Sequence, residues 1–254
     1  MNFLLHHHLA ARDLGSPAAG AGAMLPDLWR MADRRVRPAP GGRPEAPDDA
    51  VLAGIAHHVA ADRWFHADAV FTDGEREAAG LLREARITAP RAPLFAHILW
   101  ELCLDGALLR SEGLADVLAS LREGLAEVRP SAAARAAELH HFGRVARTDA
   151  DRDAFDRRLG RIFDELARGP WIDGYQTGPG LAERIQGVRA AVGLTPMDGD
   201  DRTRFAAVAD RLLERAPAAV GHILAQGKAG SIGAPRLPAP WSPEQVESAL
   251  VPRP

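Results

Sequence analysis

The sequence contains almost no cysteine and almost no lysine. A single cysteine, Cys103, excludes a disulfide bond within the chain. It lies in the apolar run "ILWELCLDGALL" without a histidine in the pattern that thiol catalysis needs, so we interpret it as a small buried hydrophobe. Lys228 is the only lysine, and the formal charge is -3. This charge gives no general attraction to nucleic acid or to an anionic membrane, so we expect no nucleic-acid partner.

Long hydrophobic runs are also absent. No run approaches the ~20 apolar residues that a membrane span needs. The first residues, "MNFLLHHHLAARDLG", carry no Lys or Arg before a short apolar part that histidines interrupt. This pattern is not that of a secretory signal. We therefore expect a soluble cytoplasmic protein without a membrane span; the sequence does not report its oligomeric state.

The residue types that favour helices are abundant in the chain. Ala, Leu, Arg and Glu dominate, and apolar residues recur at spacings of three and four. We predict one all-α domain over residues 1–226 and a Pro/Gly-rich tail over 227–254. The expected helices cover 25–35 with Pro26 near its start, a segment from Asp48 or Asp49 to His66, one from Asp73 to about Arg86, 93–109, 113–127, 131–144, 149–168, 179–193 and 200–225. A loop, "VRPAPGGRPEAP", follows the first of them.

The stretch "GIAHHVAADRWFHADAVFTD", residues 54–73, is rich in histidine and aspartate. Its residues His58, Asp62 and His66 lie four apart, so they follow one face of a helix with roughly 6 Å of rise between neighbours. Imidazole and carboxylate are ligands that divalent transition metals take. His58 and Asp62 therefore form half of a metal site, and a histidine-rich amphipathic helix is the alternative.

The same spacing returns at His97, Glu101 and Asp105, in an apolar segment. A carboxylate there costs several kcal/mol to desolvate unless it is paired or bound to a cation. Two such helices packed side by side would face these rows toward one another, as in the metal centres of helical bundles. For either helix alone, a surface ion-pair row or a satisfied core histidine remains the alternative. The repetition favours the metal interpretation.

His66 and Asp105 are the outlying members of the two rows. Eight residues of helix rise about 12 Å, too far to share one ion with the first residue of the same row. They could bind a second ion, a phosphate or a substrate, or hydrogen-bond a metal ligand.

Five short segments of the chain occur in the same order as the motifs of a known family: "MNFLLHHHLA", "GAMLPDLW", "VLAGIAHHVAAD", "FTD" and "HILWELCL". In order and spacing they resemble the acyl carrier protein phosphodiesterase family, whose pattern runs M-N-[FY]-L-A-H, G-N-L-x-x-D, G-I-x-x-H-x-x-x-D and D-x-x-x-D-H. The later "PWIDGYQTGPGLAERIQGVRAAVG" looks like its W-x-x-x-Y segment and the helix after it. The resemblance covers roughly residues 1–220.

The resemblance implies an all-α fold related to the HD phosphohydrolases and a metal-dependent release of 4'-phosphopantetheine from acyl carrier protein. It places the family's N-terminal histidine on His6, its following acid on Asp27, and its H-x-x-x-D on His58 and Asp62. The implied metal is manganese, although mixed nitrogen and oxygen ligands suit zinc, iron, cobalt or nickel as well.

The chain departs from the family where D-x-x-x-D-H is expected. His97, Glu101 and Leu102 stand there, so both carboxylate positions are changed and the histidine is gone. The chain also inserts "RWFHADAV", which brings His66, after Asp62. Metal binding can survive these changes, but the substrate becomes uncertain. A non-catalytic metal-binding protein that binds a carrier protein or another partner is therefore the alternative to an enzyme.

The expected mechanism is metal-assisted hydrolysis of a phosphodiester. The ligands would be His6, Asp27, His58, Asp62, His97 and Glu101, and the ion would activate water and stabilise charge on the phosphoryl oxygens. Asp27 is also placed among the catalytic residues. His66 or Asp105 would give a proton to the leaving oxygen. Arg63, Arg91 and Arg30 are candidates for binding the phosphate, with Arg63 next to Asp62 the first of them.

Overall fold

The computed structural model describes residues 2–36, 49–87, 92–139, 148–191 and 193–228. All regular elements in these ranges are helices, which confirms the all-α prediction. The α-helices are α1 (Phe3–Leu14), α2 (Pro17–Ala32), α3 (Ala50–Ala67), α4 (Ala69–Glu84), α5 (Ala92–Glu112), α6 (Leu114–Val128), α7 (Ala132–Leu139), α9 (Asp149–Arg168), α10 (Pro170–Asp173), α11 (Gly178–Ala191) and α12 (Gly199–Lys228). Two 3-10 helices, η1 (Arg129–Ser131) and η2 (Gly174–Gln176), complete the set.

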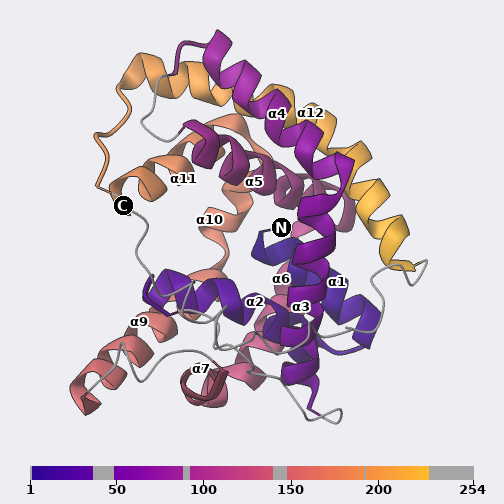
Figure 1. The fold of residues 1–254 in the computed structure, drawn as a ribbon, viewed down its shortest axis with the longest axis vertical. Coiled ribbons are helices and arrows are strands. Elements are labelled where there is room, and N and C mark those ends of the chain that lie inside the picture. Colours follow the sequence, from indigo (N-terminus) through magenta and orange to yellow (C-terminus); the bar gives the residue numbers. More distant parts are fainter. Residues whose placement is uncertain (1, 37–48, 88–91, 140–147, 192, 229–254) are drawn as a thin grey trace, which may run out of the picture.

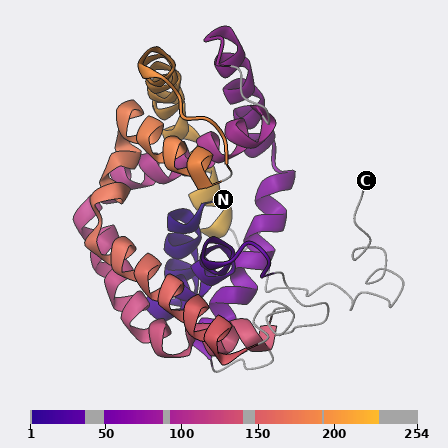
Figure 2. The same cartoon turned by 90° about the vertical axis from the view of Figure 1, so that its left-hand side faces the viewer.

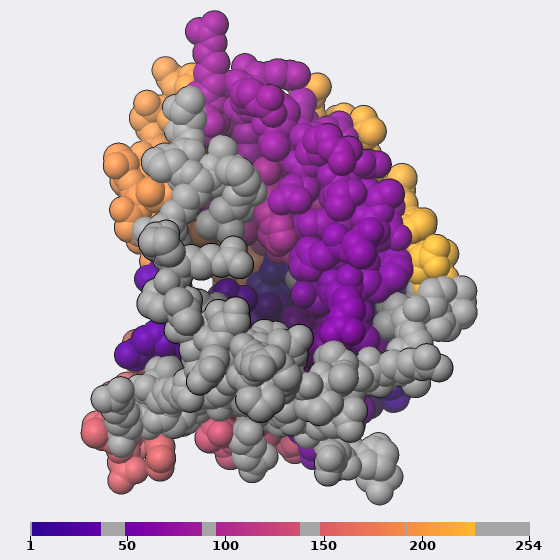
Figure 3. Space-filling view, in the orientation of Figure 1, coloured from indigo at the N-terminus to yellow at the C-terminus, as the bar shows by residue number. Residues whose placement is uncertain are grey.

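Helix α1 lies at the centre of the molecule. In Figures 1 and 2 the helix begins near the middle of the molecule, and it packs against α2, α3, α5 and α12. Most of its residues are buried, and Phe3, Leu4, Leu5 and Leu9 belong to one hydrophobic core that the described helices share. The long helix α12 runs beside α4 and α5 on the outside. Figure 3 shows a recess in one face, with indigo atoms of the N-terminal helices at its floor and purple atoms of α3 along its right side.

Helices α2 and α3 approach each other unusually closely. A Cβ atom added to Gly54 would lie 2.0 Å from the carbonyl oxygen of Ala19, and one added to Gly22 would lie 2.4 Å from that of Val51. Only glycine fits at such a backbone contact. Because the two helices carry Asp27 and His58, this contact also sets the distance between those side chains.

Three helix starts differ from the sequence prediction. Helix α1 was not among the predicted helices. Helix α2 begins at Pro17, with the Ser16 side chain accepting a hydrogen bond from the Ala19 N–H, so that Pro26 lies inside the helix and not near its start. The glycines of its first half lower helix propensity, but burial against α1 and α3 overrides this effect.

The start of α4 is the third difference. The Asp68 side chain caps α4 by accepting a hydrogen bond from the Val70 N–H at 2.8 Å, whereas Asp73, the predicted cap, lies inside the helix and pairs with Arg76. Asp68 precedes the first turn, so its carboxylate reaches the free N–H groups there.

Other boundaries agree with the prediction to within a few residues. Helix α3 is capped by Asp49, one of the two predicted residues, and α9 spans the predicted range behind a capping box of Thr148 and Asp151. Asp48, nearly all of the predicted loop, the end of the predicted 131–144 helix and the tail beyond Lys228 lie outside the described residues.

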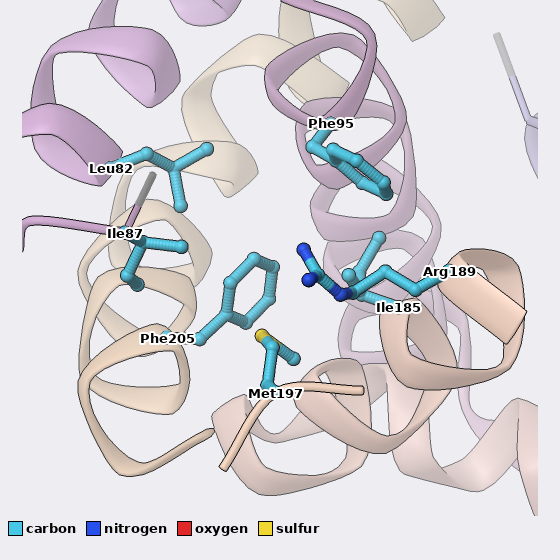
Figure 4. Close-up of a pocket in the computed structure, with 7 residues that line it drawn as sticks. All are labelled: Leu82, Ile87, Phe95, Ile185, Arg189, Met197 and Phe205. Atoms are coloured by element: carbon cyan, nitrogen blue, oxygen red, sulfur yellow. The ribbon is translucent and has the colours of Figure 1, made fainter. Parts of the chain in front are cut away.

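A small cavity lies between α4, α5, α11 and α12. Figure 4 shows Arg189 pointing toward Phe205 and Met197 there, and its guanidinium donates hydrogen bonds to the carbonyl oxygen of Thr195. The cavity measures about 10 Å³, about the space of one water molecule. It therefore has no room for a substrate. Among the described residues, no helix combines the length and apolar character that a membrane crossing requires.

The contact between α2 and α3 gives a test of the fold. We expect Gly54→Ala to lower the free energy of unfolding by about 1–3 kcal/mol, because the added methyl group meets the Ala19 backbone. The matched control is Gly80→Ala in α4, where a Cβ meets nothing within 4 Å, and it should stabilise by roughly 0.5–1 kcal/mol. Urea denaturation of both variants measures this; equal effects would contradict the packing argument.

Candidate metal centre

The position of α1 depends on a buried carboxylate of α5. Asp105 is fully buried, and its oxygens accept hydrogen bonds from the N–H groups of Leu4 at 3.3 Å and Leu5 at 3.0 Å. These N–H groups belong to the first turn of α1, which has no partner within the helix for them. Burial raises the pKa of Asp105 to about 8, although the two backbone N–H groups act in the opposite direction. The next residue of α1 is His6.

His6, Asp27 and His58 form the first group, from α1, α2 and α3. One ligand atom from each lies within 4.8 Å of the others. The rings of His6 and His58 are 4.0 Å apart, centroid to centroid. Neither ring nitrogen of His6, nor Nδ1 of His58, has a hydrogen-bonding partner among the described residues. Burying such atoms without a partner costs about 1–3 kcal/mol each, which a bound cation would offset. These three residues can hold a metal ion.

Burial keeps the two histidines of the first group neutral. It lowers the pKa of His6 to about 3, with His58 adding to the effect, and the pKa of His58 to about 4. Burial also raises the pKa of Asp27 to about 6, while His6 acts to lower it. Neutral imidazoles present lone pairs to a metal, and a bound cation would favour the ionised form of Asp27 and so lower its pKa again.

His66, His97 and Glu101 form the second group, from α3 and α5. Their ligand atoms also lie within 4.8 Å of one another. Oε1 of Glu101 is 3.5 Å from Nε2 of His66 and 3.3 Å from Nε2 of His97, and the two rings stack with centroids 5.2 Å apart. This group can also hold a metal ion, and it is more accessible than the first, since about a third of each imidazole side chain is exposed.

Carboxylates favour the protonated imidazoles of the second group. Contacts with Asp62 and Glu101 raise the pKa of His66 to about 9, and contact with Glu101 raises that of His97. Burial alone would raise the pKa of Glu101, but the two histidines hold it below its usual range. Without a metal the second group is therefore a cluster of opposite charges.

Asp62 lies between the two groups. Its Oδ1 is 3.7 Å from Nε2 of His6 and 3.4 Å from Nδ1 of His66. Despite partial burial, these histidines hold the pKa of Asp62 below its usual range. The structure thus brings seven of the predicted residues into two adjoining groups: His6, Asp27, His58, Asp62, His66, His97 and Glu101.

The expected side-by-side packing of the two helices is wrong. Helices α3 and α5 meet where His66 approaches Glu101, while α1 and α4 each pack against both of them. As a result, the row on α3 is divided between two sites. His58 points to α1 and α2, and His66 points to α5. The spacing of four residues puts His58 and His66 about two turns apart on α3, and they belong to different groups.

The remaining predicted residues lie apart from the two groups or outside the description. Asp105 binds the backbone of α1, so the structure gives it a positioning contact; its role as a proton donor stays a prediction. Arg30 and Arg63 are exposed on α2 and α3. Arg91 lies outside the described residues. Cys103 is fully buried, as predicted, and burial raises its pKa above its ordinary value.

Sequence reasoning missed Glu75 and Phe71 of α4. Oε1 of Glu75 is 3.3 Å from Nδ1 of His97. The ring of Phe71 meets His66 and His97 edge-on, with centroids 4.6 and 4.9 Å away. No spacing in the sequence links α4 to the two groups. The segment "FTD", quoted for the resemblance, contains Phe71 but ends two residues before Glu75.

Comparison with known proteins adds no relative. Protein-family models, curated proteins and solved structures were searched, and none of them matches this chain.

The first group predicts how stability depends on pH. Without metal, the contribution of His6 and His58 to the free energy of unfolding should fall as pH drops below 6.5, the ordinary pKa of histidine, toward the folded values of about 3 and 4. At these two residues the unfolded chain binds more protons in that window, so each contributes a loss of up to about 1.4 kcal/mol per pH unit. Asp27 and Asp105, whose pKa values burial raises, act in the opposite direction, so the comparison with a His58 variant isolates the histidine contribution. Urea denaturation of chelated protein between pH 7 and 5 measures the slope. His58→Asn should make it shallower; an unchanged slope would argue against a buried neutral His58.

The Asp105 contact predicts a difference between two variants. We expect Asp105→Ala to lower the free energy of unfolding by roughly 2–4 kcal/mol, because it leaves two buried N–H groups of α1 without an acceptor. Asp105→Asn keeps one acceptor oxygen and should cost less than half as much. Denaturation curves compare the two, and equal losses would show that the carboxylate does not hold α1.

Proposed function

We propose that this protein is a metal-dependent phosphodiester hydrolase with an HD-phosphohydrolase-like arrangement. The observation that carries the proposal is the first group. His6, Asp27 and His58 come from three helices, converge within 4.8 Å, and include buried imidazole nitrogens without a hydrogen-bonding partner. A structural core would not retain such atoms without compensation. The resemblance to the acyl carrier protein phosphodiesterases places ligands on the same residues.

The arrangement suits hydrolysis because a buried cation site lies beside a partly exposed carboxylate. A divalent ion bound there would supply Lewis-acid stabilisation of the negative charge on phosphoryl oxygens. Asp62, whose side chain is 39% exposed, lies between this buried group and the open second group. A phosphodiester could therefore approach from the side of His66 and His97. Water adds across the phosphorus–oxygen bond, and the leaving oxygen takes a proton.

The substrate follows from the resemblance and not from the geometry. We propose manganese as the physiological ion and the 4'-phosphopantetheine linkage of acyl carrier protein as the first substrate to test. The changed positions His97 and Glu101 favour a related phosphoester as the second. Arg63 is exposed next to Asp62 and is the proposed contact for the phosphate.

Loss of one ligand provides the functional test. We expect Asp27→Asn to keep the fold, because the two side chains have the same size, and to lower kcat/KM for bis(p-nitrophenyl) phosphate with Mn²⁺ by about 100-fold or more. The control is Asp153→Asn, an exposed aspartate of α9, which should leave the rate unchanged. Release of p-nitrophenol measures the rate, and mass spectrometry of holo-acyl carrier protein measures loss of phosphopantetheine.

The outcomes separate the proposals. Hydrolysis of the aryl diester with intact carrier protein would reject the carrier-protein substrate and retain the hydrolase. Metal binding without any hydrolysis would favour the non-catalytic metal-binding protein. A wild-type chain that binds no metal and hydrolyses neither substrate would overturn the proposed function.

A further inference from the structure

The second group has a feature that an ordinary ion-pair cluster lacks. Nε2 of His66 and Nε2 of His97 both point at one atom, Oε1 of Glu101, at 3.5 and 3.3 Å. Hydrogen bonds between imidazolium and carboxylate are shorter, at about 2.7–2.9 Å. Two ligands about 2.0–2.2 Å from one tetrahedral ion are roughly 3.3–3.6 Å apart. The two distances from Glu101 are thus those between ligands around one ion, and all three ligand atoms lie within 4.8 Å of one another.

The outer nitrogens of the two imidazoles support the same interpretation. Nδ1 of His66 lies 3.4 Å from Oδ1 of Asp62, and Nδ1 of His97 lies 3.3 Å from Oε1 of Glu75. Histidine ligands of metals nearly always donate their other N–H to a carboxylate or carbonyl, which fixes the tautomer and leaves the inner lone pair for the ion. Both histidines have a carboxylate next to this nitrogen, although at 3.4 and 3.3 Å it is farther away than in a formed imidazole–carboxylate hydrogen bond. In addition, the buried Nε2 of His66 has no hydrogen-bonding partner among the described residues.

From this geometry we infer a second cation site, formed by His66, His97 and Glu101, with Asp62 and Glu75 as positioning residues. The site takes a divalent transition metal, since its donors are two imidazoles and one carboxylate. Three protein ligands leave at least one coordination position for water or for a substrate oxygen. The catalytic role of this site rests on the proposed hydrolase function. With it, the proposed active site becomes a centre of two ions.

Asp62 gives the two cation sites a physical connection. Its Oδ1 contacts both His6 of the first group and His66 of the second. Two-ion centres stabilise both the attacking and the leaving oxygen of a phosphoryl transfer. The second ion would also displace the proton from Nε2 of His66. The role of ligand therefore excludes the role of proton donor that the sequence suggested for His66.

Metal stoichiometry tests the inference directly. After chelation and reconstitution with Mn²⁺, we expect the wild-type chain to bind about two ions by elemental analysis, as in two-metal hydrolases. His97→Ala, with a partly exposed side chain, should bind about one ion and keep its circular dichroism spectrum. The control is His222→Ala, because His222 is also partly exposed and lies 3.4 Å from a carboxylate, that of Asp68, outside both groups. It should bind about two ions.

Further readouts identify which ion is lost. Asp27→Asn should also bind about one ion, but at the other site. Electron paramagnetic resonance of Mn²⁺ should show coupled ions in the wild-type chain and an isolated ion in either variant. Glu75→Gln should keep two ions at saturation while weakening the second by about 10–100-fold, since it removes a carboxylate that orients a ligand.

The results can refute the second cation site while the proposed hydrolase function still stands. If the wild-type chain binds one ion and is active, and His97→Ala binds one ion as well, the second site is refuted and the proposed hydrolase function stands. Loss of both ions in His97→Ala, with the fold intact, would also refute a separate second site. An inactive wild-type chain that binds two ions would refute the hydrolase and leave the second site standing.

Discussion

The arrangement of the centre depends on how the first turn of α1 is held inside the protein. The N–H groups at a helix start need acceptors, and burial removes water as one. Asp105 of α5 supplies the acceptors for Leu4 and Leu5. This contact allows α1 to run through the core and brings His6 between α2 and α3. Asp105, which the spacing pattern placed in a row with His97 and Glu101, therefore holds the start of α1 in place.

The close contact of α2 and α3 completes the first group. Glycines at positions 22 and 54 allow the backbones to approach, so Asp27 and His58 reach the same point as His6. The core packs these helices tightly, yet it leaves imidazole nitrogens without partners. Protein interiors rarely keep unsatisfied polar atoms without a functional reason. The first group is thus held in place by tightly packed helices, and its imidazole nitrogens are available to a metal ion. This combination is the physical basis of the proposed function.

The second group differs from the first in accessibility and charge. Its histidines are surrounded by Asp62, Glu75 and Glu101, and about a third of each imidazole side chain is exposed. Its candidate ligands come from two helices, His66 from α3 and His97 and Glu101 from α5.

The sequence by itself determined the helical class, most helix boundaries and the residue types of the candidate ligands. Helical periodicity and the capping side chains of α3 and α9 are local properties, so they can be read along the chain. The grouping of ligands could not be read in this way. The spacing of the row placed His66 too far from His58 to share its ion, but it did not show which partners each side chain meets, because those depend on which helices cover that part of α3. Only the tertiary structure divided this row between two groups and brought Glu75 to His97, because those contacts join helices that no sequence spacing relates.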